Sequence, residues 1–205
     1  MKDLTKKRTI IAAKTICKVA ILSAIAFVLH LLRFPMPFMF PGFLDFQISD
    51  MPGVLAGFAM GPIAGSAVIL VKTLLKFVVQ GSSFGGIGEL ADVLIGCAFV
   101  VTASLIYKKI KNKKGALIGL IIGTAASCIV ALILNRFALI PFMANAYGWQ
   151  GIISSVSALF PAATEANFYN YYLPLTVLPF NLLRCAVSAL IAFLIYKKLS
   201  SVLHW

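Results

Sequence analysis

Acidic residues are scarce in this chain of 205 residues, which has six Asp and Glu against eighteen Lys and Arg. Charged residues of both signs make up only 12% of the sequence, about half the share found in soluble domains, whereas apolar residues make up 61%. The few acids form no repeated carboxylate motif for a divalent metal. This balance excludes an ordinary soluble domain and predicts a membrane protein.

Motifs for enzyme chemistry are also missing. The sequence has no GxxxxGK[ST] loop for nucleotide phosphates, no HExxH zinc motif and no GxSxG nucleophile turn. Two histidines are too few for a metal cluster, and the four cysteines are scattered singly through apolar runs, as small buried residues are. We therefore expect neither enzyme activity nor a cofactor. The two halves of the sequence also show no inverted repeat, which weakens the case for a self-sufficient secondary transporter. A membrane protein that binds a solute without such a repeat or a nucleotide-binding motif would need a partner to drive transport.

Six apolar runs have the length and composition of helices in a membrane bundle. They cover residues 16–32, 50–60, 62–80, 89–107, 115–142 and 173–196. The second run is short for a full crossing, so we expect its helix to be tilted or shielded by its neighbours. Gly61-Pro62 marks the turn that separates it from the third. The predicted fold class is an all-α membrane protein, a single domain of six transmembrane helices over residues 1–205.

Basic residues gather at the ends of the apolar runs rather than along a polar face. Membrane orientation therefore explains the net charge of +12 better than nucleic-acid binding does. With six crossings and cytoplasmic termini, the basic segments 1–15 and 108–114 and the Lys197-Lys198 end all lie inside, as the positive-inside rule requires. The basic start leads into a run long enough to span, so we expect no cleavable signal peptide. The connections with few Lys or Arg fall outside: 33–52, 81–88 and 143–172.

The connection 33–52 (RFPMPFMFPGFLDFQISDMP) differs from a simple linker. Four prolines and a glycine exclude a regular helix over its length. Its aromatic residues and few polar side chains also distinguish it from a flexible Ser/Gly-rich segment. We expect an ordered lid over a small-molecule site, with its polar side chains facing inward.

Polar groups within membrane depth are costly and are candidates for function. The sequence places eight in or near the spans: Lys72, Lys76, Glu89, Asp92, Asn135, Arg136, Asn181 and Arg184. The predicted topology puts all of them in the outer half of the membrane. One interpretation is mutual pairing, for example of Lys76 with Glu89 or Asp92, together with snorkelling to the interface. For Asn135 and Asn181 a ligand is the better interpretation, because an amide cannot reach far and needs several hydrogen-bond partners.

Together these residues indicate a pocket for a heteroaromatic ligand with a polar tail. The two amides and Arg184 can hydrogen-bond to ring nitrogens and carbonyls, whereas Asp45, Gln47 and Glu89 can bind hydroxyl groups. Phenylalanines can stack on a flat ring, although interface packing also explains each of them alone. The candidates are Phe38, Phe40, Phe43, Phe46, Phe77 and Phe84.

The first apolar run contains Ala20 and Ala24, two small residues four positions apart. Small residues at this spacing form a flat groove that lets another helix approach closely. Such pairs are common in membrane helices, so packing within the chain and docking of a partner are equally good interpretations.

Several motifs occur in a characteristic order along nearly the whole chain. They are RFPMPF (33–38), LDFQISDMPGVLAGFAMGPIAG (44–65), VKTLLKF (71–77), GGIGELAD (85–92), GLIIGT (119–124), LNRFALIP (134–141) and PFNLLR (179–184). In this series the sequence resembles the substrate-binding S components of energy-coupling-factor (ECF) vitamin importers, most closely the riboflavin-specific ones.

The resemblance implies a six-helix bundle that binds the vitamin near the outer face, beneath the first outer loop. The family positions that hydrogen-bond the isoalloxazine ring match Asn135, Asn181 and Arg184. The loop that covers the ligand matches Leu44, Asp45 and Phe46, and a neighbouring position on the third span matches Phe77. Ala20 and Ala24 match the small-residue motif that meets the transmembrane coupling subunit.

The implied function is high-affinity capture of riboflavin at the outer face of a bacterial cell membrane. Delivery inward would depend on a coupling protein and two ATPase subunits, which hydrolyse ATP. One alternative is an S component for another vitamin, such as pantothenate or a queuosine precursor. The other is a membrane enzyme or a structural membrane subunit.

Overall fold

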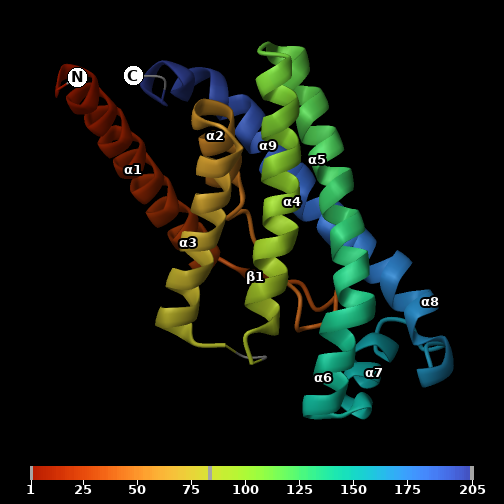
Figure 1. Cartoon of the computed structure of the whole chain (residues 1–205). Coiled ribbons are helices and arrows are strands. Elements are labelled where there is room, and N and C mark those ends of the chain that lie inside the picture. The colour runs from red at the N-terminus through yellow and green to blue at the C-terminus, as the bar shows by residue number, and fades with distance from the viewer. Residues whose placement is uncertain (1, 83–84, 204–205) are drawn as a thin grey trace.

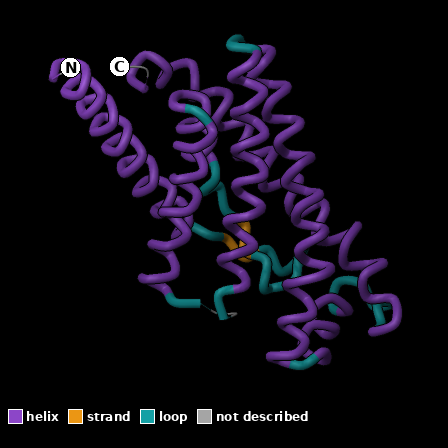
Figure 2. The backbone as a smooth tube through the Cα atoms, in the orientation of Figure 1, coloured by secondary structure: helices purple, strands orange, loops and turns teal. Residues whose placement is uncertain are grey.

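A computed structural model describes residues 2–82 and 85–203 of the chain, and the side chains of residues 13–82 and 85–196. Helices dominate the structure (Figure 1, Figure 2). In chain order they are α1 (Lys2–Leu31), α2 (Met51–Met60), α3 (Pro62–Gln80), α4 (Ile87–Lys109), α5 (Lys113–Leu134), α6 (Ile140–Tyr147), α7 (Trp149–Ser157), α8 (Phe168–Tyr172) and α9 (Leu178–Leu203). Phe84, one of the predicted stacking residues, lies outside the described residues.

Five helical stretches in the described part of the chain are long and apolar enough to cross a membrane. They are Ala13–Leu31, Pro62–Gln80, Ile87–Lys109, Lys113–Tyr147 and Glu165–Tyr196. Helix α2 has only ten residues, and its first eight, Met51 to Phe58, are buried by neighbouring elements. The prediction that the second helix is short and shielded is therefore confirmed, and it does not make a full crossing by itself.

Helices α4 and α5 pack closely because glycines recur at every fourth position of α5, at Gly115, Gly119 and Gly123. A methyl group on Gly119 would lie 2.6 Å from the carbonyl oxygen of Ala103 on α4, so the two backbones leave no room for a side chain there. The connection between these helices is shorter than the predicted 108–114. Helix α4 continues to Lys109, and α5 begins at Lys113 behind an N-cap bond from the backbone N of Gly115 to the side chain of Asn112.

Two very short strands form in the proline-rich connection. Strand β1 (Phe34–Pro35) pairs antiparallel with β2 (Asp45–Phe46), so the segment is ordered without being helical. The hairpin lies between the helices, part-way along their length, rather than beyond their ends (Figure 2). In a membrane, non-helical backbone at such a depth is tolerated only where protein buries it or where it lines a cavity.

Two wide turns of π-helix interrupt the last long helical stretches. Asn135–Leu139 joins α5 to α6, and Leu173–Val177 joins α8 to α9. A proline follows shortly after each turn, at Pro141 and Pro179, and its ring nitrogen cannot donate to the preceding turn of helix. The wider hydrogen-bonding pattern accommodates that loss, and π-turns are frequent at functional sites.

The connection predicted over 143–172 is wrong in its secondary structure, because most of it is helical. Helix α6 extends to Tyr147, a glycine with φ of 84° turns the chain into α7, and a 3₁₀ turn (Glu165–Asn167) leads into α8. These short helices contain Asn, Tyr and Trp, residues with only moderate helix propensity. Their formation depends on packing: Tyr172 and Phe168 of α8 stack and are fully buried.

The elements are arranged so that the start of α1, the end of α9 and the α4–α5 turn lie at one end of the bundle (Figure 1). The α3–α4 connection and helices α6 and α7 lie at the other end. One apolar core surrounds Val54, Phe99 and Val100, and a second surrounds Ile140 and Tyr172.

Candidate ligand-binding site

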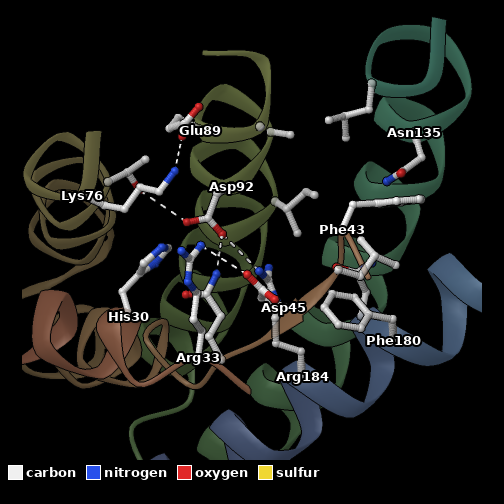
Figure 3. A pocket seen from close by; sticks show the side chains of 18 of the residues that line it. His30, Arg33, Phe43, Asp45, Lys76, Glu89, Asp92, Asn135, Phe180 and Arg184 are labelled. Carbon is white, nitrogen blue, oxygen red and sulfur yellow. Dashed lines mark hydrogen bonds and ion pairs between the residues drawn. The ribbon is translucent and has the colours of Figure 1, made fainter. Parts of the chain in front are cut away.

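A cavity of about 340 Å³ lies between residues 33–52, which we call the hairpin segment, and helices α1, α3, α4, α6, α8 and α9, with the π-turn Asn135–Leu139 also in its wall (Figure 3). Its size suits a small organic ligand. Seven of the nine predicted ligand-binding residues line it: Leu44, Asp45, Gln47, Glu89, Asn135, Asn181 and Arg184. They come from segments far apart in the sequence, so the fold brings them together.

Other predicted residues do not line the cavity. Phe46 belongs to β2 but is not part of the cavity wall, and Phe77 and Phe38 are largely exposed, at 46% and 75%. Arg136 points elsewhere and lies over the ring of Tyr169, 3.8 Å from its centroid. The predicted stacking roles of Phe38, Phe46 and Phe77 therefore have no support in the geometry.

Two other phenylalanines provide aromatic surface. Phe43, a predicted stacking residue, lines the cavity, and so does Phe180, which the sequence did not single out. Phe40 is buried behind Phe180 with its ring edge-on, the centroids 5.1 Å apart. Phe40 thus supports the wall that Phe180 presents.

Four charged side chains form a closed arrangement beside the cavity, which we call the ion ring: Asp50, Lys72, Asp92 and Arg184. Lys72 Nζ lies 2.5 Å from Asp50 Oδ1 and 3.3 Å from Asp92 Oδ2. Arg184 Nη1 lies 3.0 Å from Asp92 Oδ1, and its Nη2 lies 3.3 Å from Asp50 Oδ2. Two cations thus alternate with two carboxylates, and all four are largely or fully buried. Pairing is required because an isolated charge at this depth would be very costly.

The ion ring joins four elements. Asp50 stands immediately before α2, whereas Lys72, Asp92 and Arg184 project from α3, α4 and α9. Only Asp92 and Arg184 also line the cavity. Asp50 was not among the predicted polar residues within membrane depth, although the scarcity of acids was a signal: four of the six lie around this cavity.

Two further ion pairs flank the ring. Lys76 pairs with Glu89, as the mutual-pairing interpretation predicted, and the second oxygen of Glu89 accepts a 2.7 Å hydrogen bond from Ser82. Arg33, just before β1, places its Nη1 3.2 Å from Oδ2 of Asp45 in β2. Figure 3 shows both pairs. Each carboxylate around the cavity thus faces a cation.

The two predicted amides are oriented by their own helices. Asn135 donates to the carbonyl of Ala131 (2.8 Å) and accepts from the hydroxyl of Tyr172 (2.8 Å). Asn181 donates to the carbonyl of Val177 (2.9 Å), and no donor among the described residues binds its side-chain oxygen. Tyr172, a cavity-lining residue that the sequence did not indicate, therefore partners Asn135.

Arg184 holds donors that the protein itself does not use. Its Nε and Nη2 are buried and make no hydrogen bond of good geometry within the described chain, although Nη2 is close enough to Asp50 for an electrostatic contact. Buried donors without partners are rare and need an explanation.

The hairpin segment is tied to the ion ring by a chain of polar contacts. Lys72 Nζ donates to Ser49 Oγ (2.7 Å), and Ser49 donates to the side-chain oxygen of Gln47 (2.9 Å). Gln47 Nε2 in turn lies 3.4 Å from Asp92 Oδ1, a long hydrogen bond. The position of the cavity-lining Gln47 therefore depends on the ring.

His30, at the end of α1, is another lining residue that sequence reasoning missed. Its Nδ1 is buried without a hydrogen-bond partner in the described structure. The sequence analysis considered histidines only as metal ligands. Within the described residues no three His, Cys, Asp or Glu side chains could hold a metal ion.

Ala20 and Ala24 are exposed on α1, on a surface that also exposes Ile16, Ile21 and Ile25. Packing within the chain therefore does not account for the two alanines. The apolar face they belong to is available to lipid or to another protein.

A cavity inside a helical membrane bundle, lined by oriented amides, matched charges and apolar side chains, defines a membrane protein with a site for a small organic solute. The chain belongs to the family of ECF transporter substrate-specific components, whose family model matches residues 14–196. Members of this family are components of transporters rather than enzymes. The resemblance to ECF S components that the sequence motifs indicated is therefore confirmed.

Individual relatives agree with this assignment. The chain is 37% identical over 190 residues to "Riboflavin transporter RibU" of Staphylococcus aureus (strain TCH60), covering 93% of this chain and 92% of the relative. It is 35% identical over 189 residues to "Riboflavin transporter FmnP" of Bacillus subtilis (strain 168), covering 91% and 92%. A solved structure described as the S component of a bacterial ECF transporter matches with a TM-score of 0.71 and 33% identity, over 95% of this chain and 99% of that one.

Proposed function

We propose that this chain is the riboflavin-binding S component of an ECF-type importer and captures the vitamin at the outer face of a bacterial cell membrane. The observation that carries the proposal is one cavity in which oriented amides, a restrained arginine and aromatic surface converge. The relatives named as riboflavin transporters, similar over more than nine-tenths of the chain, support the same ligand.

The chemistry of the cavity suits riboflavin. The oxygen of Asn181 and the donors of Arg184 offer complementary partners for the ring's imide N–H and carbonyls. Phe43 and Phe180 offer aromatic surface to a flat ring. The ribityl hydroxyls suit polar side chains that line the cavity, namely those of Asp45, Gln47 and Glu89.

Six crossings with both termini in the cytoplasm remain our proposed topology. The five long apolar helices and the short, buried helix α2 together make six. The hairpin segment, residues 33–52, then forms the outer lid, and the lysines of 108–114 lie inside, in agreement with the positive-inside rule.

The partners we propose are a transmembrane coupling protein and two ATPase subunits. The exposed face of α1 around Ala20 and Ala24 is the docking candidate, because small residues allow close helix approach. Ala20→Trp should leave riboflavin binding by the isolated protein unchanged but abolish uptake in cells that contain the partners. Uptake at the wild-type rate would show that the partner docks on another face of the protein.

The bound molecule tests the ligand directly. The protein should be purified without added vitamin, denatured, and the released small molecules identified by mass spectrometry. Riboflavin in near-stoichiometric amount is the expected result. A different vitamin would retain the transporter class but overturn the ligand, and the Asn181→Ala/Arg184→Ala variant, which should release none, controls for adventitious flavin.

A further inference from the structure

Two members of the ion ring do not touch the cavity. Asp50 and Lys72 are 2% and 0% exposed and stand behind Asp92 and Arg184, which line it. We propose that Asp50 and Lys72 are positioning residues for ligand binding, which hold the Arg184 guanidinium in the orientation that the cavity needs. The proposal rests on the proposed function, because Arg184 is the group that meets the ligand.

The geometry of the guanidinium supports this role. Its two terminal nitrogens are held by different carboxylates, Nη1 by Asp92 at 3.0 Å and Nη2 by Asp50 at 3.3 Å. A planar group fixed at both ends cannot turn about its axis. The contact of Nη2 with Asp50 is electrostatic, whereas Nε makes no hydrogen bond within the described chain.

The charge balance of the ring explains why both residues are needed. Lys72 occupies Oδ1 of Asp50 at 2.5 Å and also reaches Asp92 at 3.3 Å, so each carboxylate is shared between two cations. Without Asp50, Lys72 and Arg184 would compete for Asp92 alone. Burial prevents water and salt from screening that imbalance, so the cations would have to move apart.

Lys72 also restrains a second residue of the cavity wall. It donates to Ser49 at 2.7 Å, and Ser49 fixes the side-chain oxygen of Gln47 at 2.9 Å. Gln47 lines the cavity, whereas Ser49 and Lys72 do not. One buried ammonium group thus restrains a residue of the hairpin segment and, through Asp50, a residue of α9.

If Asp50 and Lys72 only stabilised the fold, riboflavin affinity would fall and recover together with the Tm. The test therefore measures affinity and stability separately. Asp50→Asn keeps the shape of the side chain but places an amide where the carboxylate faces Lys72 and Arg184. Lys72→Met/Asp50→Asn removes one charge of each sign and restores a neutral ring. Riboflavin affinity, the Tm and the visible absorption band of bound flavin should be measured for both variants in the same detergent.

We expect Asp50→Asn to lower the Tm and to weaken riboflavin binding at least about tenfold. The double variant should regain most of the Tm, yet its affinity should stay at least about tenfold weaker and its bound-flavin band should remain shifted. The control is Val100→Ala, which leaves a small cavity in the apolar core without changing any charge and should lower the Tm without shifting the band.

The outcomes separate the inference from the proposed function. If the double variant binds riboflavin with wild-type affinity and spectrum, the positioning role is wrong and the proposed function stands. If the wild-type protein binds no riboflavin, the proposed function itself fails. Should the double variant not fold, Asp50→Asn decides by comparison with Val100→Ala: an affinity loss no larger than that of the control overturns the positioning role.

Discussion

The two ends of this bundle use charge in opposite ways. Around the cavity, four carboxylates face four cations in contacts of about hydrogen-bond length. At the other end, the α4–α5 turn exposes five lysines between residues 108 and 114 with no acid in the same segment. A charge in water needs no partner, whereas a charge at membrane depth does. The chain therefore concentrates its few acids at the cavity and leaves surplus cations exposed in the α4–α5 turn.

The largest effect should come from opening the ion ring at its most connected member. Asp92 contacts Lys72, Arg184 and Gln47, so Asp92→Ala should strand buried cations and destabilise the fold by about 3–5 kcal/mol. Thermal unfolding in detergent measures the loss. Glu165→Ala, which removes an exposed acid, is the matched control and should leave the Tm nearly unchanged. Equal Tm values for the two variants would contradict a structural role for the ring.

Removal of a single amide should have a smaller effect, confined to the ligand. Asn181→Ala should weaken riboflavin binding by about 1–3 kcal/mol, because it leaves polar groups of the ligand without a partner. Fluorescence titration measures the change. Asn145→Ala, an exposed amide on α6, is the control. If both variants bind like the wild type, Asn181 does not belong to the site.

The ion pair Arg33–Asp45 tests whether an ion pair contributes less to stability when it is exposed to solvent. These side chains are 40% and 33% exposed, so their coupling in a double-mutant cycle on stability should be only about 0–1 kcal/mol. The same cycle on Lys72 and Asp50 should give a clearly larger value because both are buried. Similar coupling energies in the two cycles would remove the distinction between buried and exposed pairs.

The smallest effect is expected at the lysine-rich end. Lys108→Gln removes an exposed charge at the end of α4 and should change stability by less than about 0.5 kcal/mol. Riboflavin affinity should stay at the wild-type value. A loss of binding in this variant would show that the two ends are coupled, which the separation of their charges does not predict.

The sequence predicted the long helices well because apolar runs and turn residues carry that information. Helix α3 begins and ends at the predicted residues, Pro62 and Gln80, since Gly61 and Gly81 adopt positive φ at its two ends. The short helices between residues 143 and 172 were missed because tertiary packing, rather than propensity, stabilises them. The hairpin was missed because strands of two residues leave no alternating pattern.

The sequence predicted most polar residues of the cavity but missed most of its aromatic residues. Successive residues of a helix point about 100° apart, so a prediction that does not fix the helix phase can choose the wrong neighbour. Lys76 lines the cavity whereas Phe77, one residue later, faces outward. Phe180 and Tyr172 also line the cavity, on either side of the π-turn Leu173–Val177, whose wider register no simple periodicity reveals. Asp50 was overlooked because it stands where a loop becomes a helix.

The central claim is that this cavity binds riboflavin through oriented amides and the arginine that the ion ring restrains. Titration of purified protein with riboflavin, followed by quenching of the vitamin's fluorescence, tests it most directly. The wild-type protein should quench stoichiometrically at micromolar vitamin, and Asn181→Ala/Arg184→Ala should not. Absence of quenching by the wild type, or equal quenching by the double variant, would contradict the account.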